Sequence, residues 1–240
     1  MTTILSIDTS GTCCSVALGL DNKHLIRRAE TPREHVRLVL PMVDELLAEA
    51  AIPLAALDAI AFTHGPGSFT GLRIGFGVVQ GLAFGADLPV IALSTLQVLA
   101  QTAIHRECLA NGTIVIPALD ARMGELYWGA YQVCNGVAQP LTSDGLCPQK
   151  AISLPPLDAL ASDPLIIGAG DGWQYQAKLR SADKCITLDQ IHPDIGPDAE
   201  DLLTLAIPAF QQGMTSAIEN VEPVYLRNTI SWKKRQRLRS

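Results

Sequence analysis

The chain has 240 residues, of which 48% are hydrophobic and 18% charged, enough for one large domain or two of about 110 residues with a substantial core. Its net charge is −6, yet residues 233–239 hold five of the 18 basic residues and no acidic one, which leaves a body with 13 basic and 24 acidic residues. Such a body is a poor platform for nucleic acid, so only the tail, Lys233 to Arg239, is a candidate to reach a phosphate backbone. The alternative is a solvated end.

The chain predicts no membrane span, disulfide framework or zinc site. Its most apolar stretch, residues 71–93, contains Arg73, Gln80 and Asp87 and falls short of about 18 uninterrupted apolar residues. The six cysteines are scattered without a C-x-x-C pair, so we expect reduced thiols. The chain opens on a strand pattern without a basic region or cleavage signal, and we expect a cytoplasmic protein that does not contact a membrane.

A β-hairpin is the first predicted element. Residues 4–18 contain an apolar strand, a turn of polar residues and glycine, and an alternating second strand. Asp8 ends the first strand, and Thr9 and Ser10 follow it, a grouping that suits a phosphate or a hydrated metal ion. The alternative is an ordinary turn in which Asp8 and Ser10 bond their own backbone.

A helix is predicted to follow residue 31. Thr31 is the expected N-cap, Pro32 the first helical residue and Glu34 the partner in a capping box. We expect Pro41 to kink or interrupt this helix. The helix carries an apolar stripe that faces the core, with a share that faces a partner: Val36, Val39, Leu40, Val43 and Leu47.

The next elements form a βαβ unit around a glycine-rich loop. Residues 57–62 are typical of a buried strand, residues 71–85 of a helix and residues 88–93 of a second strand, and the loop GPGSFTGLRIG occupies residues 65–75. Backbone N–H groups near Gly67 and Ser68, at the start of the helix, are suited to an anion. The alternative is that the glycines only permit a tight turn and close packing.

Glycines recur on two faces of this helix. Each glycine inside a helix lowers helix stability by about 1 kcal/mol relative to alanine. Close packing of another backbone against the glycines would offset this loss. The domain's own sheet can cover one face, and the second face favours a partner helix. One series is Gly67, Gly71 and Gly75, and the other is Gly77, Gly81 and Gly85.

The second half of the chain repeats the opening pattern. A helix over residues 95–104 precedes a strand, an aspartate, a turn and a second strand, and Asp120 stands where Asp8 stood. A later strand enters a glycine turn at residues 168–172, and a helix over 199–212 is able to pack back on the first half. The recurrence predicts two related subdomains, 1–106 and 107–222, and a C-terminal segment, 223–240.

Catalytic motifs are scarce. The chain contains no H-E-x-x-H, G-x-S-x-G or Walker A motif, and its histidines never pair at metal-ligand spacing. The enzyme hypothesis that stays open is a self-standing peptidase or nucleotide hydrolase that uses Asp8, His64 and Ser68.

Three segments resemble the TsaB (YeaZ) family: IDTS at residues 7–10, the glycine loop at 65–75, and PVYLR at 223–227. The likeness covers nearly the whole chain, and the loop is highly specific. It implies the α/β fold of actin, hexokinase and Hsp70 (ASKHA), with two RNase H-like subdomains. It also implies a cytosolic bacterial protein needed to make threonylcarbamoyladenosine beside the anticodon of tRNAs that read codons beginning with A.

The resemblance further implies a non-catalytic scaffold and activator that binds the transferase TsaD, together with the ATPase TsaE, and meets tRNA indirectly through the complex. The histidine pair that holds the metal of TsaD would fall on Thr95 and Leu99, so no metal is expected here. Trp173 and Asp171 crowd the superfamily's nucleotide cleft, so no resident cofactor is expected, and weak or shared ATP or ADP binding would belong only to the complex.

Two sets of site residues follow from the resemblance. The first set docks on TsaD, or pairs as a homodimer when TsaD is absent: Val36, Val39, Leu40, Val43, Leu72, Arg73, Phe76, Gly77, Gln80 and Gly81. The second set would line a nucleotide or anion cleft: Asp8, Thr9, Ser10, Gly67, Ser68, Asp120, Gly168 and Gly170.

Overall fold

The computed structural model describes residues 2–20, 23–30, 34–149, 152, 164–178 and 188–227. Its first sheet has the order β3-β2-β1-β4-β5, in which β1, β2 and β3 are antiparallel neighbours and β4 and β5 run parallel to β1. The elements of this half are β1 (Thr3–Asp8), β2 (Cys14–Leu20), β3 (Lys23–Ala29), α1 (His35–Ala50), η1 (Leu54–Ala56), β4 (Ala59–Gly65), α2 (Phe69–Ala86), β5 (Val90–Ser94) and α3 (Thr95–Arg106).

The second sheet repeats this topology. Its order is β10-β7-β6-β11-β12, with antiparallel pairs from β10 to β6 and parallel pairs from β6 to β12. A hairpin of β8 and β9 is inserted beside the start of β6. The elements are β6 (Ile114–Asp120), β7 (Glu125–Trp128), β8 (Tyr131–Cys134), β9 (Val137–Pro140), β10 (Gly145–Pro148), β11 (Ile166–Ala169), η3 (Asp171–Lys178), β12 (Gln190–His192), α4 (Ala199–Gln211) and η4 (Ile218–Asn220). The repeat confirms the prediction of two RNase H-like subdomains.

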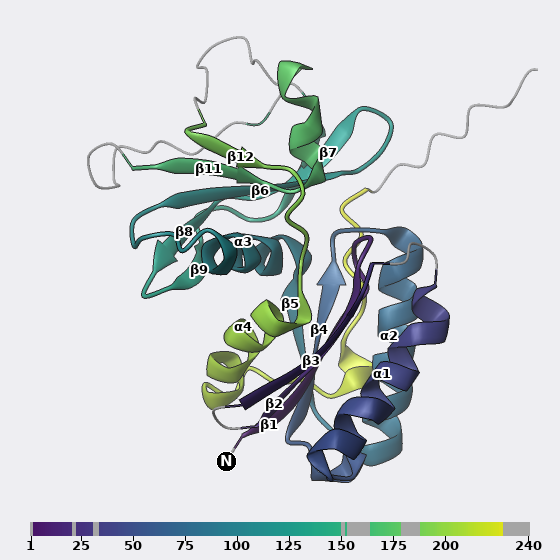
Figure 1. The fold of residues 1–240 in the computed structure, drawn as a ribbon. Helices are drawn as coiled ribbons and strands as arrows, with labels where there is room; N and C mark the ends of the chain where they lie inside the picture. The colour runs from purple at the N-terminus through teal and green to yellow at the C-terminus, as the bar shows by residue number, and fades with distance from the viewer. Residues whose placement is uncertain are drawn as a thin grey trace, which may run out of the picture.

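The final helix of each half packs on the other half (Figure 1). Helix α3 follows the first sheet in the chain but packs on β6 and β9, whereas α4 follows the second sheet and packs on β1 and β2. The two helices also contact each other, so they form the layer between the sheets. The predicted boundary at residue 106 therefore does not coincide with the boundary between the hydrophobic cores, because α3, which precedes it in the chain, packs on the second subdomain.

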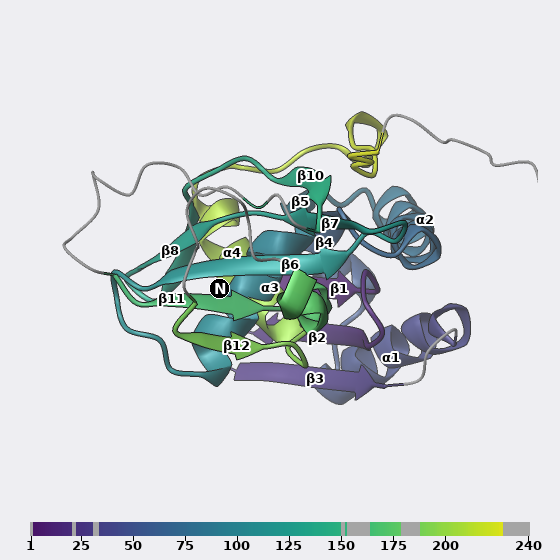
Figure 2. The same ribbon diagram turned by 90° about the horizontal axis from the view of Figure 1, so that it is seen from above.

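Apolar residues alternate across the first sheet and fill a core on each face. Leu5, Ile60 and Phe62 point to the layer of α1 and α2, and Ile4 and Ala61 point to α4. Because the β-strand period is two, consecutive residues on one strand serve the two cores. Helices α1 and α2 lie side by side on their face in both views (Figures 1 and 2).

The first helix departs from the prediction. It begins at His35, with Glu34 at the N-cap and no side-chain cap, rather than at Pro32, and Thr31 and Pro32 lie outside the described residues. It also continues through Pro41 to Ala50. Pro41 stands in the second turn, where its missing N–H removes one internal hydrogen bond and the packing of the stripe below compensates.

The C-terminal segment joins the subdomains. The Val224 N–H donates to the His64 carbonyl oxygen (2.7 Å) at the end of β4. Three residues on, the Arg227 guanidinium donates to the Ala121 carbonyl oxygen (3.0 Å) in the β6–β7 turn and pairs with Glu125 at the start of β7. Residues 221–227, which we call the C-terminal strap, therefore run from the first subdomain to the second.

Helix α2 is the one helix in the described part of the chain that is long and apolar enough to cross a membrane. Core helices of folded domains pass the same test, and Val79 and Ala83 of α2 pack in the first core. The opposite side of the helix is uncovered and carries Gly77, Gly81 and Gly85 together with the exposed side chains of Arg73, Gln80 and Phe84.

Candidate partner interface and inter-subdomain cleft

The first glycine series lets α2 approach the β1–β2 turn. A Cβ atom at Gly67 would lie 2.9 Å from the Ser10 carbonyl oxygen, and Cβ atoms at Gly71 and Gly75 would overlap oxygens of Thr9. The Ser68 N–H donates to the Ser10 carbonyl oxygen at 2.9 Å. This series serves close packing within the chain.

The second series is open. A Cβ atom at Gly77, Gly81 or Gly85 would meet nothing within 4 Å. Phe84 beside them is 74% exposed, and Arg73 and Gln80 are also exposed on this side. We call the surface formed by Gly77, Gln80, Gly81, Phe84 and Gly85 the open glycine face. It is a smooth strip of helix backbone with an aromatic side chain at its edge.

Helix α1 adds two exposed apolar side chains next to this helix, Val36 (65% exposed) and Leu40 (44%). Val39 and Val43, which were predicted to share the interface, are buried in the first core, and Leu72 is also buried. The prediction was wrong for these three because they lie on the sides of α1 and α2 that face the sheet. Phe76 is half-buried with its ring 6.0 Å from that of Phe62.

The residues around Asp8 form a closed turn. Asp8, Thr9 and Ser10 are at most 2% exposed. Asp8 Oδ1 accepts hydrogen bonds from Ser10 Oγ (2.6 Å), Thr63 Oγ1 (2.6 Å) and the Ser10 N–H (3.2 Å). Burial raises the pKa of Asp8 to about 6. The three side chains are buried in this structure, and Asp8 Oδ2 has no hydrogen-bond partner among the described residues, so a nucleotide or anion site here stays a prediction.

The loop at the start of α2 is likewise occupied by its own chain. Gly67 is half-buried against Ser10, and Ser68 is the exposed N-cap, whose Oγ accepts from the Gly71 N–H at 3.3 Å. Two backbone N–H groups at the start of the helix, those of Ser68 and Gly71, therefore donate within the chain rather than to an anion. The packing alternative accounts for the glycines of this loop.

In the second subdomain, Trp173 fills the space beside Gly168 on the face of the sheet turned away from α3. Its Nε1–H donates to the Ile116 carbonyl oxygen (2.8 Å), and a Cβ atom at Gly168 would lie 2.9 Å from its ring. Gly170 packs against Ala118 in the same way. Asp120 accepts from the Arg122 N–H, and its own N–H donates to Asp171 Oδ1 (2.9 Å). In the described part of the chain no hydrogen bond joins Asp120 to the Asp8 turn.

The structure does not assemble the three residues of the hydrolase hypothesis. Asp8 bonds Ser10 and Thr63, Ser68 caps α2, and His64 lies beside Leu93, where burial lowers its pKa. A metal-binding group of three or more His, Cys, Asp or Glu is also absent from the residues that the structure describes.

A polar cluster that was not predicted joins the subdomains near His64. Asp144 accepts from Tyr131 OH (2.6 Å) and from Ser94 Oγ, while Ser94 also caps α3. Burial raises the pKa of Asp144. Ser94 lies 37 residues from Tyr131 and 50 residues from Asp144 in the chain, so no local sequence pattern predicts this cluster.

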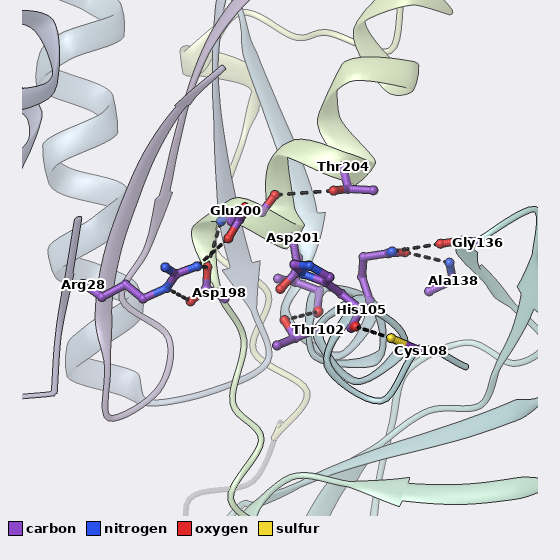
Figure 3. A network of polar contacts seen from close by, with 12 residues as sticks. Arg28, Thr102, His105, Cys108, Gly136, Ala138, Asp198, Glu200, Asp201 and Thr204 are labelled. Carbon is purple, nitrogen blue, oxygen red and sulfur yellow. Dashed lines mark hydrogen bonds and ion pairs between the residues drawn. The ribbon is translucent and has the colours of Figure 1, made fainter. Parts of the chain in front are cut away.

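A second polar cluster holds the chain where it returns to the first subdomain (Figure 3). Asp198, the N-cap of α4, has a 3% exposed side chain and receives both Nε (2.6 Å) and Nη2 (2.9 Å) of Arg28 from β3. Glu200 also pairs with Arg28, and Asp201 pairs with His105 of α3. These contacts are polar pairs between elements of the chain, and they fix the position of α4.

Comparisons with known proteins agree with this geometry. Residues 28–226 match the family model described as TsaD, tRNA N6-adenosine threonylcarbamoyltransferase. The chain is 40% identical to the tRNA threonylcarbamoyladenosine biosynthesis protein TsaB of Escherichia coli K12, over 96% of this chain and 97% of that one. It is 38% identical to the Haemophilus influenzae protein of the same name, over 97% and 96%. The chain belongs to the TsaB (YeaZ) family.

Solved structures of the TsaB family share the fold. YeaZ from Pseudomonas aeruginosa is 42% identical and superposes with a TM-score of 0.84 over 94% of this chain and all of that one. A further P. aeruginosa structure, described as an uncharacterized protein similar to the peptidase YeaZ, gives 42% identity and a TM-score of 0.86, over 95% and 100%.

The three segments that carry the TsaB resemblance meet in space. The loop contacts the β1–β2 turn through Ser68 and Ser10, and the strap contacts the end of β4 through Val224 and His64. Thr95 and Leu99 lie fully buried on α3, where Leu99 packs beside Gly170. A leucine in that core cannot ligate a metal ion.

Proposed function

We propose that this chain is a non-catalytic subunit of the cytoplasmic tRNA threonylcarbamoyladenosine machinery, which binds a TsaD-type transferase and, with TsaE, holds it in a working conformation. The observation that carries the proposal is the open glycine face of α2, together with the exposed side chains of Val36 and Leu40 on the neighbouring helix α1. The names of the relatives supply the pathway, and the geometry supplies the docking surface.

The open glycine face suits a helix of a partner. Glycine removes the side chains that normally keep two helices about 8–10 Å apart, so backbones approach closely and van der Waals contacts multiply. Each exposed glycine weakens the free helix, so the series is a cost to the isolated chain. Burial of Phe84, Val36 and Leu40 at the same contact would offset that cost, because a fully buried large apolar side chain contributes roughly 1.5–3 kcal/mol.

The partner is a TsaD-type protein because the chain itself matches the TsaD family model over residues 28–226. A partner with the same fold presents equivalent helices, so the two surfaces can meet in a pseudo-twofold arrangement. When TsaD is absent, a second copy of this chain can occupy the open glycine face as a homodimer.

The geometry favours a scaffold over a hydrolase. No hydrogen bond joins Asp8, His64 and Ser68 to one another in the described residues: Asp8 Oδ1 accepts from Ser10 and Thr63, and Ser68 caps α2. Trp173 fills the space beside Gly168. We therefore propose that the isolated chain holds no resident nucleotide, and that ATP or ADP binds only weakly or in the assembled complex.

The test is modification of an A-decoding tRNA by TsaC, TsaD and TsaE, with and without this chain. We expect product only when the chain is present. Gly81→Leu should abolish both product formation and co-purification with TsaD, while circular dichroism stays that of the wild type. Gln211→Leu places the same exposed leucine on α4, on the opposite side of the first sheet, and should behave as the wild type. Full activity without the chain would refute the proposal.

A further inference from the structure

The strap crosses a bare piece of backbone at the end of β4. In Figure 1 it is the yellow segment that passes α2 towards β7. A Cβ atom at Gly65 would lie 2.5 Å from the Val224 carbonyl oxygen, and the φ angle of Gly65, +121°, is one that favours glycine. The neighbouring His64 carbonyl oxygen accepts the hydrogen bond from the Val224 N–H. The first glycine of the loop therefore leaves room for the strap.

At its other end the strap is anchored on the second subdomain by one arginine. The Arg227 guanidinium donates to the carbonyl oxygens of Ala121 (3.0 Å) and Arg122 (3.3 Å) and pairs with the Glu125 carboxylate. Three acceptors around one guanidinium fix its position by geometry as well as by charge. Arg227 is the last described residue, and the predicted basic tail, residues 233–239, lies outside the described residues.

The strap is held at few points. In the described part of the chain, the Val224 N–H is the one backbone donor of the strap that bonds to a sheet. The side chains of Arg227 and Glu125 are 22% and 34% exposed, so water reaches this pair. A segment with few backbone hydrogen bonds and partly exposed contacts opens at a lower free energy than the core of a domain. The strap can therefore leave β4 while both sheets stay folded.

The closed strap places an aromatic ring beside the start of α2. Phe69 is 55% exposed and Tyr225 42% exposed, and their ring centroids are 5.6 Å apart. The Arg73 guanidinium lies 3.8 Å from the centroid of Phe69, and its Nε–H donates to Tyr225 OH at 3.2 Å. Because Val224 and Arg227 are bonded on either side of Tyr225, the two anchors set the position of this ring.

The open glycine face continues along α2 to this ring. The exposed residues on that side of the helix follow one another at intervals of three or four, which places them on one face: Phe69, Arg73, Gly77, Gln80 and Phe84. A partner helix that lies along Gly77 and continues past Arg73 therefore reaches Tyr225. Arg73 forms no ion pair within the described residues, so a carboxylate of the partner can pair with it.

We propose that the strap is a conformational switch that completes the docking surface for a TsaD-type partner. In the closed state Tyr225 lies at the end of the open glycine face, and the partner contacts α2 and the strap together. In the open state the partner loses the contact with Tyr225. The partner therefore binds the closed state more tightly and, by linkage, holds the strap closed.

The switch makes docking on the first subdomain depend on the second. Arg227 closes the strap only while the β6–β7 turn lies within its reach, so the arrangement of the two subdomains sets the fraction of chains with a complete surface. This inference rests on the proposed function and deepens it, because it names a contact outside α1 and α2 that regulates binding of the partner.

The experiment measures two quantities on the full-length chain: hydrogen exchange of the Val224 N–H in the free chain, followed by NMR, and affinity for TsaD. Arg227→Ala and Glu125→Ala each remove one side of the anchor, from different subdomains. We expect both variants to exchange faster at Val224 and to bind TsaD about 5- to 150-fold more weakly, the usual size of a coupling between two sites. Arg106→Ala removes an exposed arginine of α3 and should match the wild type in both measurements.

Tyr225→Ala tests whether the strap acts through this ring. The variant keeps both anchors, so it should weaken TsaD binding without faster exchange at Val224. The double variant Tyr225→Ala with Arg227→Ala should bind about as weakly as Tyr225→Ala alone, because the second change removes no further contact with the partner. Additive losses would show that Arg227 acts on the partner by another route and would overturn the proposal.

Two other outcomes would overturn it. An unchanged TsaD affinity of Arg227→Ala would make the strap a structural tie between the subdomains. Weaker binding without faster exchange at Val224 would make Arg227 a direct contact of the partner. Gly81→Leu separates this proposal from the proposed function: if it alone abolishes TsaD binding, the proposed function stands and the switch fails, and if it binds TsaD as the wild type, the proposed function fails.

Discussion

The same substitution at two positions of α2 should change stability in opposite directions. Gly81 has nothing within 4 Å of a Cβ atom, so Gly81→Ala adds a methyl group to an exposed helix interior without a clash. Alanine loses less backbone entropy on folding than glycine, so the free energy of unfolding should rise by about 0.5–1 kcal/mol. For a chain of this size the midpoint of thermal unfolding should rise by roughly 1–4 °C.

Gly71 is the matched position on the covered face of α2. A Cβ atom there would overlap the Thr9 carbonyl oxygen, which belongs to the rigid β1–β2 turn. Overpacking of this kind costs about 1–3 kcal/mol, which outweighs the gain in helix propensity, so Gly71→Ala should unfold at lower temperature than the wild type.

The assay is thermal and urea unfolding of both variants at protein concentrations low enough to keep the chain monomeric, followed by titration with TsaD. Gly81→Ala should be more stable and should bind TsaD more weakly, because the methyl group separates the two helices. A Gly81→Ala chain that is less stable than the wild type as a monomer, or a Gly71→Ala chain that is more stable, would refute the assignment of the two glycine faces.

Two further outcomes follow from buried charges. Arg28→Ala leaves the carboxylate of Asp198 buried without its ion-pair partner. The free energy of unfolding measured in urea should fall by roughly 2–3 kcal/mol, which is at or below the usual loss for a broken buried pair because the Arg28 side chain is 42% exposed. An unchanged urea midpoint would contradict this prediction. Because the folded chain keeps the Asp8 proton up to about pH 6 and the unfolded chain releases it near pH 4, the wild type should lose stability relative to Asp8→Asn as the pH rises between these values, by about 1.4 kcal/mol per pH unit. A stability difference between the two that does not depend on pH would show that Asp8 is ionised in the fold.

Local patterns in the chain predicted most elements but not which of their faces are covered. The α1 stripe is wide enough to include Val36 and Leu40 at its exposed edge and Val39 and Val43 at its buried one, and hydrophobic spacing does not distinguish them. The two glycine series on α2 are equivalent in the sequence, and only the position of the β1–β2 turn decides that the first is covered.

Three features were not predicted from the sequence: the burial of Asp8, the β8–β9 hairpin and strand β3. Asp8 is buried, and one of its partners is Thr63, which lies 55 residues away in the chain and donates a hydrogen bond to Asp8 Oδ1. The β8–β9 hairpin has a local signature, Asn135-Gly136 between two short strands, which is typical of a two-residue turn. Strand β3 was not predicted because its sequence, KHLIRRA, does not alternate polar and apolar residues, and Leu25 is its one buried residue.

The exchange of α3 and α4 has a consequence for synthesis of the chain. Ile4, Ala17 and Ala61 on the first sheet are covered by Leu202, Leu203 and neighbouring residues of α4, which the ribosome makes after the second sheet. At elongation rates of about 5–20 residues per second, the interval between β5 and α4 is on the order of ten seconds. During that time a finished sheet presents a bare apolar face, so the nascent first half is a natural client for a chaperone, and a message truncated before α4 yields an aggregating product rather than a smaller stable domain.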